Sequence, residues 1–267
     1  GNIIMSDGFI LNKVSSTPTP PSFADTKSFQ FDGITDRFIG VGNYSELDGQ
    51  NKATFSFWIK PPSVISSIQV VSSVRINTSA SNKQFQIQLY TSGLIALEQD
   101  SGSKYIRGNS SALNLGQWNH VLFCFDTTQG SSANRGRVFI NGINETLATS
   151  VSGVFSTATG GLYIAENQNG QYDPFEGLLN EFSIWSGSDQ RANVSEIWNG
   201  GLPNDLNTLP TAPQPTNWFR MGEFATWNGR AFSMTDVNNS YVVRSQGLNA
   251  SDPNPTTDVP LFDNKSF

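Results

Sequence analysis

The sequence predicts an all-β sandwich, a fold of two packed β-sheets. Residues 175–185 alternate as a strand does, and both sides carry apolar bulk. One side would hold Leu178, Asn180, Phe182 and Ile184, and the other Leu179, Glu181, Ser183 and Trp185. A strand covered on both sides lies inside a sandwich. In addition, helical periodicity is confined to residues 188–199, where a short helix would start at Ser188 or Asp189 and end at Gly200.

Further strands are predicted along the chain. Residues 54–60 place Phe55, Phe57 and Ile59 on one face, and residues 67–76 form another apolar run. Residues 84–90 alternate phenylalanine, isoleucine and leucine with glutamines, which predicts core on one side and water on the other. Asn141-Gly142 predicts a hairpin, because both positions tolerate the positive φ of a type I′ turn.

Composition narrows the classes of function. The 267 residues suffice for one large all-β domain, and only 14% of them are charged. With 22 acidic and 16 basic residues and few basic clusters, we exclude nucleic acid as a partner. No apolar run approaches the ~20 residues of a membrane helix, so we expect no membrane insertion. The single cysteine, Cys124, lies in an apolar run and is interpreted as a buried small hydrophobe.

Five motifs in order resemble a known family. They are Ser28–Gly33 with Asp36, Phe55–Lys60, Trp118–Val121, Val138–Gly142 and the G-x-L-x-E-x-x-I-W strand Gly177–Trp185. Together they resemble laminin-G-like, concanavalin A-like domains, the group that includes pentraxins. The resemblance spans roughly residues 22–200 and implies an antiparallel jelly-roll β-sandwich.

The chain divides into three predicted parts. Residues 1–21 form an apolar N-terminal arm with a proline-rich linker, which would dock on its own sandwich or on a neighbouring subunit. Residues 22–201 form the sandwich. Residues 202–267 form a C-terminal extension with one or two added strands, and its segment Asn217–Glu223 resembles one that accompanies such domains in marine bacteriophage particles.

Hydrolase chemistry has little support in the sequence. Glycan hydrolases of this fold carry a strand of paired acids, one a nucleophile and the other an acid/base. The third carboxylate of that pattern is missing after both Glu46-Leu47-Asp48 and Glu98-Gln99-Asp100, which we interpret as solvated loop acids. The only histidine, His120, is interpreted as structural. We therefore expect a protein that is not an enzyme.

The resemblance to pentraxins implies positions for calcium. An acid–amide cluster before the closing strand would be Glu166, Asn167 and Asn169, and a pair on an earlier loop would be Ser81 and Asn82. Ser81 replaces an expected Asp and Asn169 an expected acid, so we expect no required cofactor, with calcium as the cation that would fit. Asp32 and Asp36 form a second candidate site, or cap an edge turn.

A glycan site would use exposed aromatic and amide side chains on one face or rim. The candidate residues are Asn82, Tyr172, Asp173 and Phe175. Tyr172 and Phe175 could instead plug the end of the sandwich, because aromatic residues before a core strand usually pack.

The leading prediction is a structural component of a virus-like or phage-like particle surface, such as a capsid decoration, fibre or tail protein. The alternatives are a carbohydrate-binding lectin module for host attachment and an extracellular adhesion repeat. The predicted partners are copies of the chain itself, other particle proteins and cell-surface glycans. The predicted location is a virion surface or the extracellular space.

Overall fold

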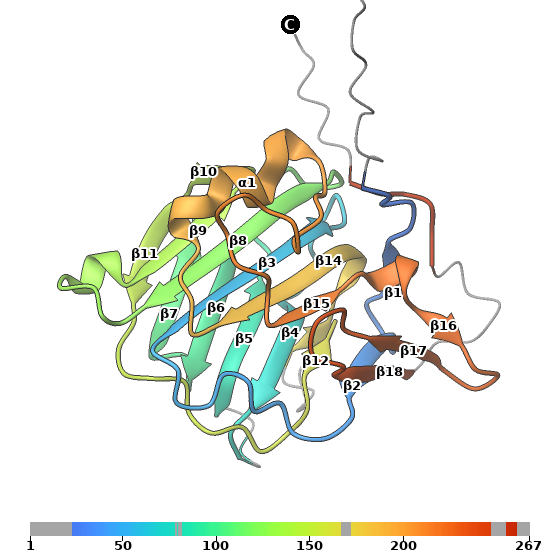
Figure 1. Cartoon of the computed structure of the whole chain (residues 1–267), viewed down its shortest axis with the longest axis horizontal. Coiled ribbons are helices and arrows are strands. Elements are labelled where there is room, and N and C mark those ends of the chain that lie inside the picture. The colour runs from blue at the N-terminus through green and yellow to red at the C-terminus, as the bar shows by residue number, and fades with distance from the viewer. Residues whose placement is uncertain (1–22, 78, 80–81, 167–171, 247–254, 261–267) are drawn as a thin grey trace, which may run out of the picture.

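The computed structural model describes residues 23–77, 79, 82–166, 172–246 and 255–260 (Figure 1). All structural statements below concern these residues. The predicted arm, residues 1–21, lies outside them.

The described residues form two sheets that pack face to face (Figure 1). In the first sheet the strand order is β1-β14-β3-β8-β9-β10, and β15 also pairs with β14. Its strands are β1 (Phe29–Asp32), β3 (Lys52–Lys60), β8 (Asn119–Asp126), β9 (Gly136–Ile140), β10 (Ile143–Asn144), β14 (Glu176–Ser186) and β15 (Asn217–Phe219).

In the second sheet the order is β11-β7-β6-β5-β4-β12-β2-β18-β17-β16. β13 adds to β4 in parallel, and the other pairings are antiparallel. The strands are β2 (Arg37–Gly40), β4 (Gln69–Arg75), β5 (Lys83–Leu89), β6 (Ile95–Asp100), β7 (Lys104–Gly108), β11 (Thr146–Ser150), β12 (Tyr163–Ile164), β13 (Asp173–Pro174), β16 (Thr226–Trp227), β17 (Phe232–Thr235) and β18 (Val242–Gln246). The predicted antiparallel jelly-roll sandwich is confirmed.

Apolar side chains are buried in two clusters. The main core between the sheets includes Phe55, Phe57 and Ile59 of β3 and Phe85, Ile87 and Leu89 of β5, as their alternation predicts. A smaller cluster lies on the outer side of the first sheet, where Trp185 and Cys124 pack with Ile197 and Trp218. β14 therefore contributes to both clusters, as a strand with two apolar sides should.

The predicted alternation along β14 is interrupted by a bulge. The pairing of β14 with β3 shifts register between Asn180 and Ser183, and Glu181 adopts a positive φ of 50°. Leu179 and Phe182 consequently both enter the main core, although strict alternation places them on opposite faces. The prediction that Leu179 and Phe182 lie on opposite faces is therefore wrong, because it assumes a regular strand without a bulge.

The helical segment is shorter than its predicted range. α1 (Val194–Trp198) lies between the 3₁₀ turns η2 (Arg191–Asn193) and η3 (Asn199–Gly201). The N-cap of η2 is Gln190, whose side chain makes no capping bond, and Asp189 before it accepts a hydrogen bond from the Arg191 backbone N–H at 3.0 Å. Asn199 and Gly200 have φ of 50° and 64°, which ends the helix. Two further 3₁₀ turns are η1 (Ser132–Asn134) and η4 (Met221–Glu223).

Asn141 and Gly142 have φ of 52° and 78° and join β9 to β10, as the hairpin signal predicts. The C-terminal extension contributes more than the predicted one or two strands. β15 extends the first sheet beside β14, and β16 to β18 extend the second sheet beyond β2. The extension is therefore part of both layers of the sandwich.

We predict that Phe182→Ala and Trp185→Ala each lower the free energy of unfolding by ~3–5 kcal/mol, because each removes a large buried side chain. Urea unfolding followed by circular dichroism measures this, with the exposed Gln30→Ala as control. Unchanged stability in both variants would refute the role of β14 as a strand buried on both sides.

Candidate functional site

A row of polar side chains crosses the outer face of the second sheet. Phe85, Ile87, Leu89, Leu97 and Ile106 point into the core, so the residues that alternate with them point outward. The pairings Gln86 with Glu98, and Glu98 with Tyr105, align these outward residues across β5, β6 and β7. We call this surface the polar face; its residues are Gln86, Gln88, Tyr90, Glu98, Tyr105 and Arg107. Lys83 is added to it because the pairing of β5 with β6 shifts register between Lys83 and Gln86, and the Lys83 ammonium reaches Glu98.

Glu98 is the centre of the polar face. Its side chain accepts hydrogen bonds from Lys83 Nζ at 3.2 Å, Gln88 Nε2 at 3.1 Å and the Tyr90 hydroxyl at 2.7 Å. The Arg107 guanidinium nitrogen Nη2 lies 3.8 Å from Glu98 Oε1, the oxygen that also accepts from Tyr90. Because only 5% of Glu98 is exposed, its oxygens depend on these donors in place of water. The sequence-based interpretation of Glu98 as a solvated loop acid is wrong: it lies on β6 and is buried.

Two polar atoms of the polar face are buried without a hydrogen-bond partner. They are the Gln86 amide nitrogen and the Gln88 amide oxygen, on residues that are 2% and 0% exposed. The bond to Glu98 fixes the orientation of the Gln88 amide, so its oxygen points away from the carboxylate. Burying a donor or acceptor without a partner costs ~1–3 kcal/mol of folding free energy. These two amide atoms are therefore destabilising unless another molecule forms hydrogen bonds with them.

The polar face also carries two tyrosine rings, Tyr90 and Tyr105. Tyr105 is half-buried, and the Arg107 guanidinium stacks on its ring at 4.1 Å from the centroid. Burial raises the pKa of the Tyr90 hydroxyl, and its bond to Glu98 raises the pKa further, so Tyr90 stays protonated and donates. The polar face thus combines ring surfaces with fixed donors and acceptors.

The predicted glycan residues are not brought together. Asn82 is half-buried and lies just before the first residue of β5. Asp173 pairs with Gln69 of β4, and Gln69 pairs with Leu89, the last residue of β5, so Asp173 lies at the opposite end of β5 from Asn82. Asp173 is exposed and accepts a hydrogen bond from Ser67. Tyr172 is half-buried and close enough to Tyr90 to affect its pKa, so it lies at the rim of the polar face.

Phe175 has no exposed surface and packs on Phe31 with a centroid separation of 6.3 Å. Its assignment as a candidate glycan contact is corrected by this position, because its ring is part of the core. The alternative prediction, that the Phe175 ring packs against the sandwich, agrees with its position.

The predicted calcium residues have partners of their own. Glu166 forms an ion pair with Arg37, and burial raises its pKa while Arg37 opposes this. Asp32 accepts hydrogen bonds from the backbone N–H groups of Ile34, Thr35 and Asp36 at 2.8, 2.9 and 3.0 Å. Burial would raise the pKa of Asp32, but these bonds outweigh it and lower the pKa. Asp36 accepts the Asp32 N–H at 3.1 Å.

The pair Asp32 and Asp36 therefore closes its own edge turn. Asn167 and Asn169 lie outside the described residues. Among the residues that the structure describes, no group of three or more His, Cys, Asp or Glu side chains could hold a metal ion. Calcium binding stays a prediction.

The chain's one histidine and one cysteine are both buried. His120 Nε2 lies 2.8 Å from the Ser56 hydroxyl, and burial lowers the His120 pKa to about 3, so the ring is neutral. Burial also raises the pKa of the Cys124 thiol, which makes it a poor nucleophile.

A second polar cluster lies on the opposite sheet, at the bulge of β14. Glu181 accepts hydrogen bonds from Trp218 Nε1 at 2.5 Å and Arg220 Nε at 3.1 Å. Asp25 accepts one from Asn180 Nδ2 at 2.7 Å. Burial raises the pKa of Asp25 to about 6 and that of Glu181 to about 8, where proximity to Asp25 adds to the rise and Arg220 opposes it. This cluster joins the N-terminal segment to the extension.

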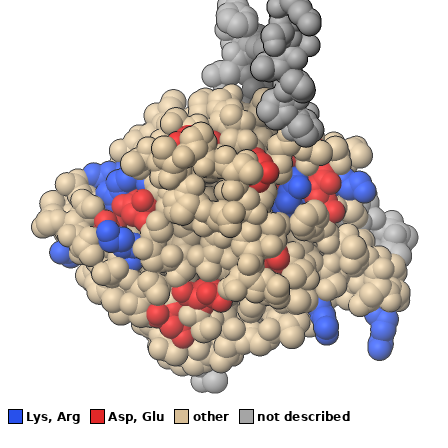
Figure 2. All heavy atoms as spheres, viewed as in Figure 1, with Lys and Arg blue, Asp and Glu red and all other residues tan. Residues whose placement is uncertain are grey.

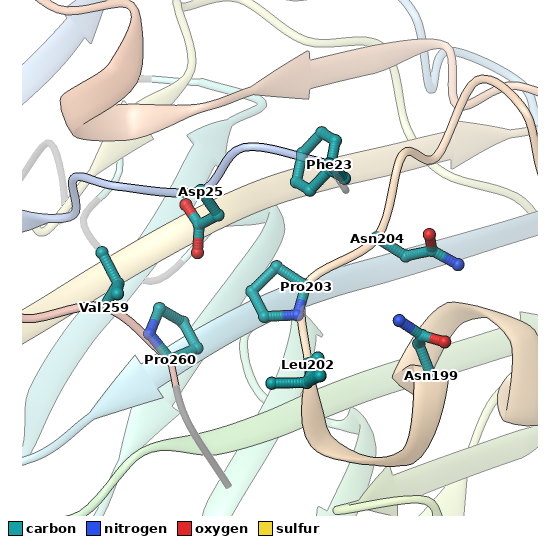
Figure 3. A pocket seen from close by; sticks show the side chains of 8 residues that line it. All are labelled: Phe23, Asp25, Asn199, Leu202, Pro203, Asn204, Val259 and Pro260. Carbon is teal, nitrogen blue, oxygen red and sulfur yellow. The ribbon is translucent and has the colours of Figure 1, made fainter. Parts of the chain in front are cut away.

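A pocket of about 460 Å³ lies beside this cluster (Figure 3). Three segments far apart in the sequence surround it: the chain before β1, η3 with the chain that follows it, and the described C-terminal residues (Figure 3). Its wall is largely apolar, with Asp25, Asn199 and Asn204 as polar members.

Charged side chains are scattered on the face seen in Figure 2, and no continuous basic band crosses it. This face therefore lacks the row of Lys and Arg side chains that binding the phosphate backbone of a nucleic acid requires. Among the described residues, no helix has the length and apolar character to cross a membrane.

The fold and the sequence together define the class of protein. A family model described as the concanavalin A-like lectin/glucanases superfamily, in its laminin G group, matches residues 35–195. The chain belongs to this family.

Two solved structures resemble the chain. A candidate carbohydrate-binding protein from Bacteroides ovatus superposes with a TM-score of 0.62 at 15% identity, over 88% of this chain. The chain spans 61% of that protein's length. A heptameric pentraxin from Limulus polyphemus superposes with a TM-score of 0.51 at 18% identity, over 83% of this chain and 95% of its own. No curated protein matches the chain in sequence.

The raised pKa of Glu181 predicts a pH-dependent stability. Between the ordinary pKa of 4.5 and about 8, the folded state holds a proton that the unfolded state releases. Stability is therefore lost as pH rises through this window, by up to about 1.4 kcal/mol per pH unit. His120 acts in the opposite direction but only up to its unfolded pKa of 6.5, and Cys124 acts in the same direction only as pH nears its unfolded pKa of 9.0, so pH 7.0–8.0 isolates Glu181.

Chemical denaturation across that range should show a falling stability in the wild type and a flatter profile in Glu181→Gln. Glu223→Gln, whose carboxyl has a lowered pKa, serves as the control and should keep the wild-type slope. Equal slopes in wild type and Glu181→Gln would contradict the assignment.

Proposed function

We propose that this chain is a non-enzymatic, lectin-like module that binds a glycan through the polar face. The observation that carries the proposal is the pair of buried, unpartnered amide atoms on Gln86 and Gln88, which lie on the same face as the ring of Tyr105, two strands away. Sugars offer hydroxyl groups for such atoms and C–H surfaces for aromatic rings. The hydroxyl groups of a bound glycan would supply the hydrogen-bond partners that the Gln86 nitrogen and the Gln88 oxygen lack within the fold.

The comparisons support the same class. The family is named for lectins as well as glucanases, and one structural neighbour is a candidate carbohydrate-binding protein. The hydrogen bonds to Glu98 support the non-enzymatic part of the proposal, because both oxygens of its carboxylate already accept from side chains of the protein. A glycosidase would also need a second carboxyl group on the other side of the scissile bond, and Glu98 is the only carboxylate among the polar-face residues.

The test is a glycan array followed by calorimetry on the hits. Tyr105→Ala should weaken binding about three- to tenfold, as expected for a ring contact worth ~0.5–1.5 kcal/mol. Its melting temperature should change little because Tyr105 is only half-buried. Arg230→Ala, an exposed residue between β16 and β17, is the control and should bind as the wild type does. Absence of hits across the array, or a Tyr105→Ala variant with full affinity, would refute the proposal.

A role on the surface of a virus-like or phage-like particle stays a second proposal, and a lectin module could serve it in host attachment. It is supported by the resemblance of Asn217–Glu223 to a segment of marine phage particle proteins. That segment includes Trp218 and Arg220, which anchor the extension to β14. In this role the chain would act at a virion surface or in the extracellular space, as a homo-oligomer or beside other particle proteins.

Self-association tests this second proposal. We predict that deleting residues 1–20 leaves the sandwich folded and shifts the protein from oligomer to monomer in size-exclusion chromatography with light scattering. Circular dichroism checks that the fold persists. A full-length chain that is already monomeric at high concentration would contradict it.

A further inference from the structure

We infer that the polar face selects an uncharged glycan and holds it through two neighbouring hydroxyl groups. The inference rests on the proposed function and names the class of ligand. It is carried by the two unpartnered amide atoms and by the pairing of the charged groups around them.

The unpartnered atoms form a complementary set. The Gln86 nitrogen can only donate, and the Gln88 oxygen can only accept. The two residues are two positions apart on β5, so their Cα atoms are about 7 Å apart and their side chains lie side by side on one face. A hydroxyl group both donates and accepts, so one hydroxyl can accept from Gln86 while its neighbour donates to Gln88. A carboxylate or sulfate only accepts and would leave the Gln88 oxygen unpaired.

Each cation of the polar face already lies beside a carboxylate, and the two cations Lys83 and Arg107 share the single carboxylate of Glu98. Lys83 is paired with Glu98 at 3.2 Å and is buried. Arg107 lies 3.8 Å from Glu98 and stacks on Tyr105. At the end of the same sheet, Lys104 is paired with Asp100 at 2.9 Å. An anionic ligand would have to compete with these carboxylates, and it would approach the buried negative charge of Glu98.

The arrangement also provides a place for the sugar ring. Ala96 is the residue directly opposite Gln88 on β6, and Arg107 is opposite Ala96 on β7. Because the side chain of Ala96 is short, Arg107 is the nearest long side chain across the sheet in this direction. The Arg107 side chain is 38% exposed, and in the proposal it moves aside so that a ligand reaches the amide atoms.

The experiment compares matched ligands by calorimetry: lactose with 3′-sialyllactose, and neutral xylo-oligosaccharides with those carrying a glucuronate. The neutral member of a pair should bind at least tenfold more tightly, with an affinity unchanged between 50 and 500 mM NaCl, since no ion pair is formed. For the best neutral ligand, deoxy analogues at two adjacent positions should each bind about five- to tenfold more weakly, the effect of one lost hydrogen bond.

Gln86→Met tests the position of the site. It removes an amide nitrogen that has no partner, so the melting temperature should stay the same or rise while glycan affinity falls about five- to tenfold. Gln30→Met, an exposed glutamine on β1 of the other sheet, is the matched control and should change neither.

The outcomes separate the two claims. If no glycan binds, charged or neutral, the proposed function fails and the inference fails with it. If only anionic glycans bind, with an affinity that falls as salt rises, the inference is overturned and the proposed function stands. If neutral glycans bind equally well to Gln86→Met, the assignment of these amides is overturned.

Discussion

The structure depends on the burial of β14 on both sides. Leu179, Phe182 and Ile184 fill the space between the sheets, while Trp185 packs in the second cluster with Cys124 and Trp218. The bulge at Glu181 allows this, because it turns one residue out of the alternation and presents a carboxyl group to the extension. Trp218 and Arg220 bind that carboxyl group, so the strand that completes the core also anchors the C-terminal extension.

The same principle of a two-sided strand applies to β5, with a different result. Its inner side chains are apolar and hold the sheets together, which leaves its outer side free to carry glutamines. These would ordinarily be hydrated, yet Gln86 and Gln88 are buried among Lys83, Tyr90 and Glu98. The cost of burying two unpaired amide atoms is not repaid within the described chain. A buried polar atom without a partner calls for an explanation, and the one proposed here is a bound glycan.

Sequence alone predicts the sandwich, the core strands and the Asn141-Gly142 hairpin, because these follow from local alternation and turn geometry. It fails where contacts between distant residues decide the outcome. Glu98 resembles a loop acid until pairing with Gln86 and Tyr105 places it at the centre of a buried network. The bulge at Glu181 is equally invisible, since its partners Trp218 and Arg220 lie almost forty residues away. Of the predicted glycan residues, Tyr172 lies near the polar face, whereas Phe175 belongs to the main core and packs on Phe31.

The most direct test of the central claim is a crystal structure of the protein with its tightest-binding neutral oligosaccharide. The account predicts that a sugar hydroxyl lies within hydrogen-bond distance of the Gln86 amide nitrogen and an adjacent one within that distance of the Gln88 amide oxygen, with the ring beside Tyr105. A sugar bound in the pocket beside Phe23 and Asp25, or at any position that leaves both amides unpaired, would contradict it.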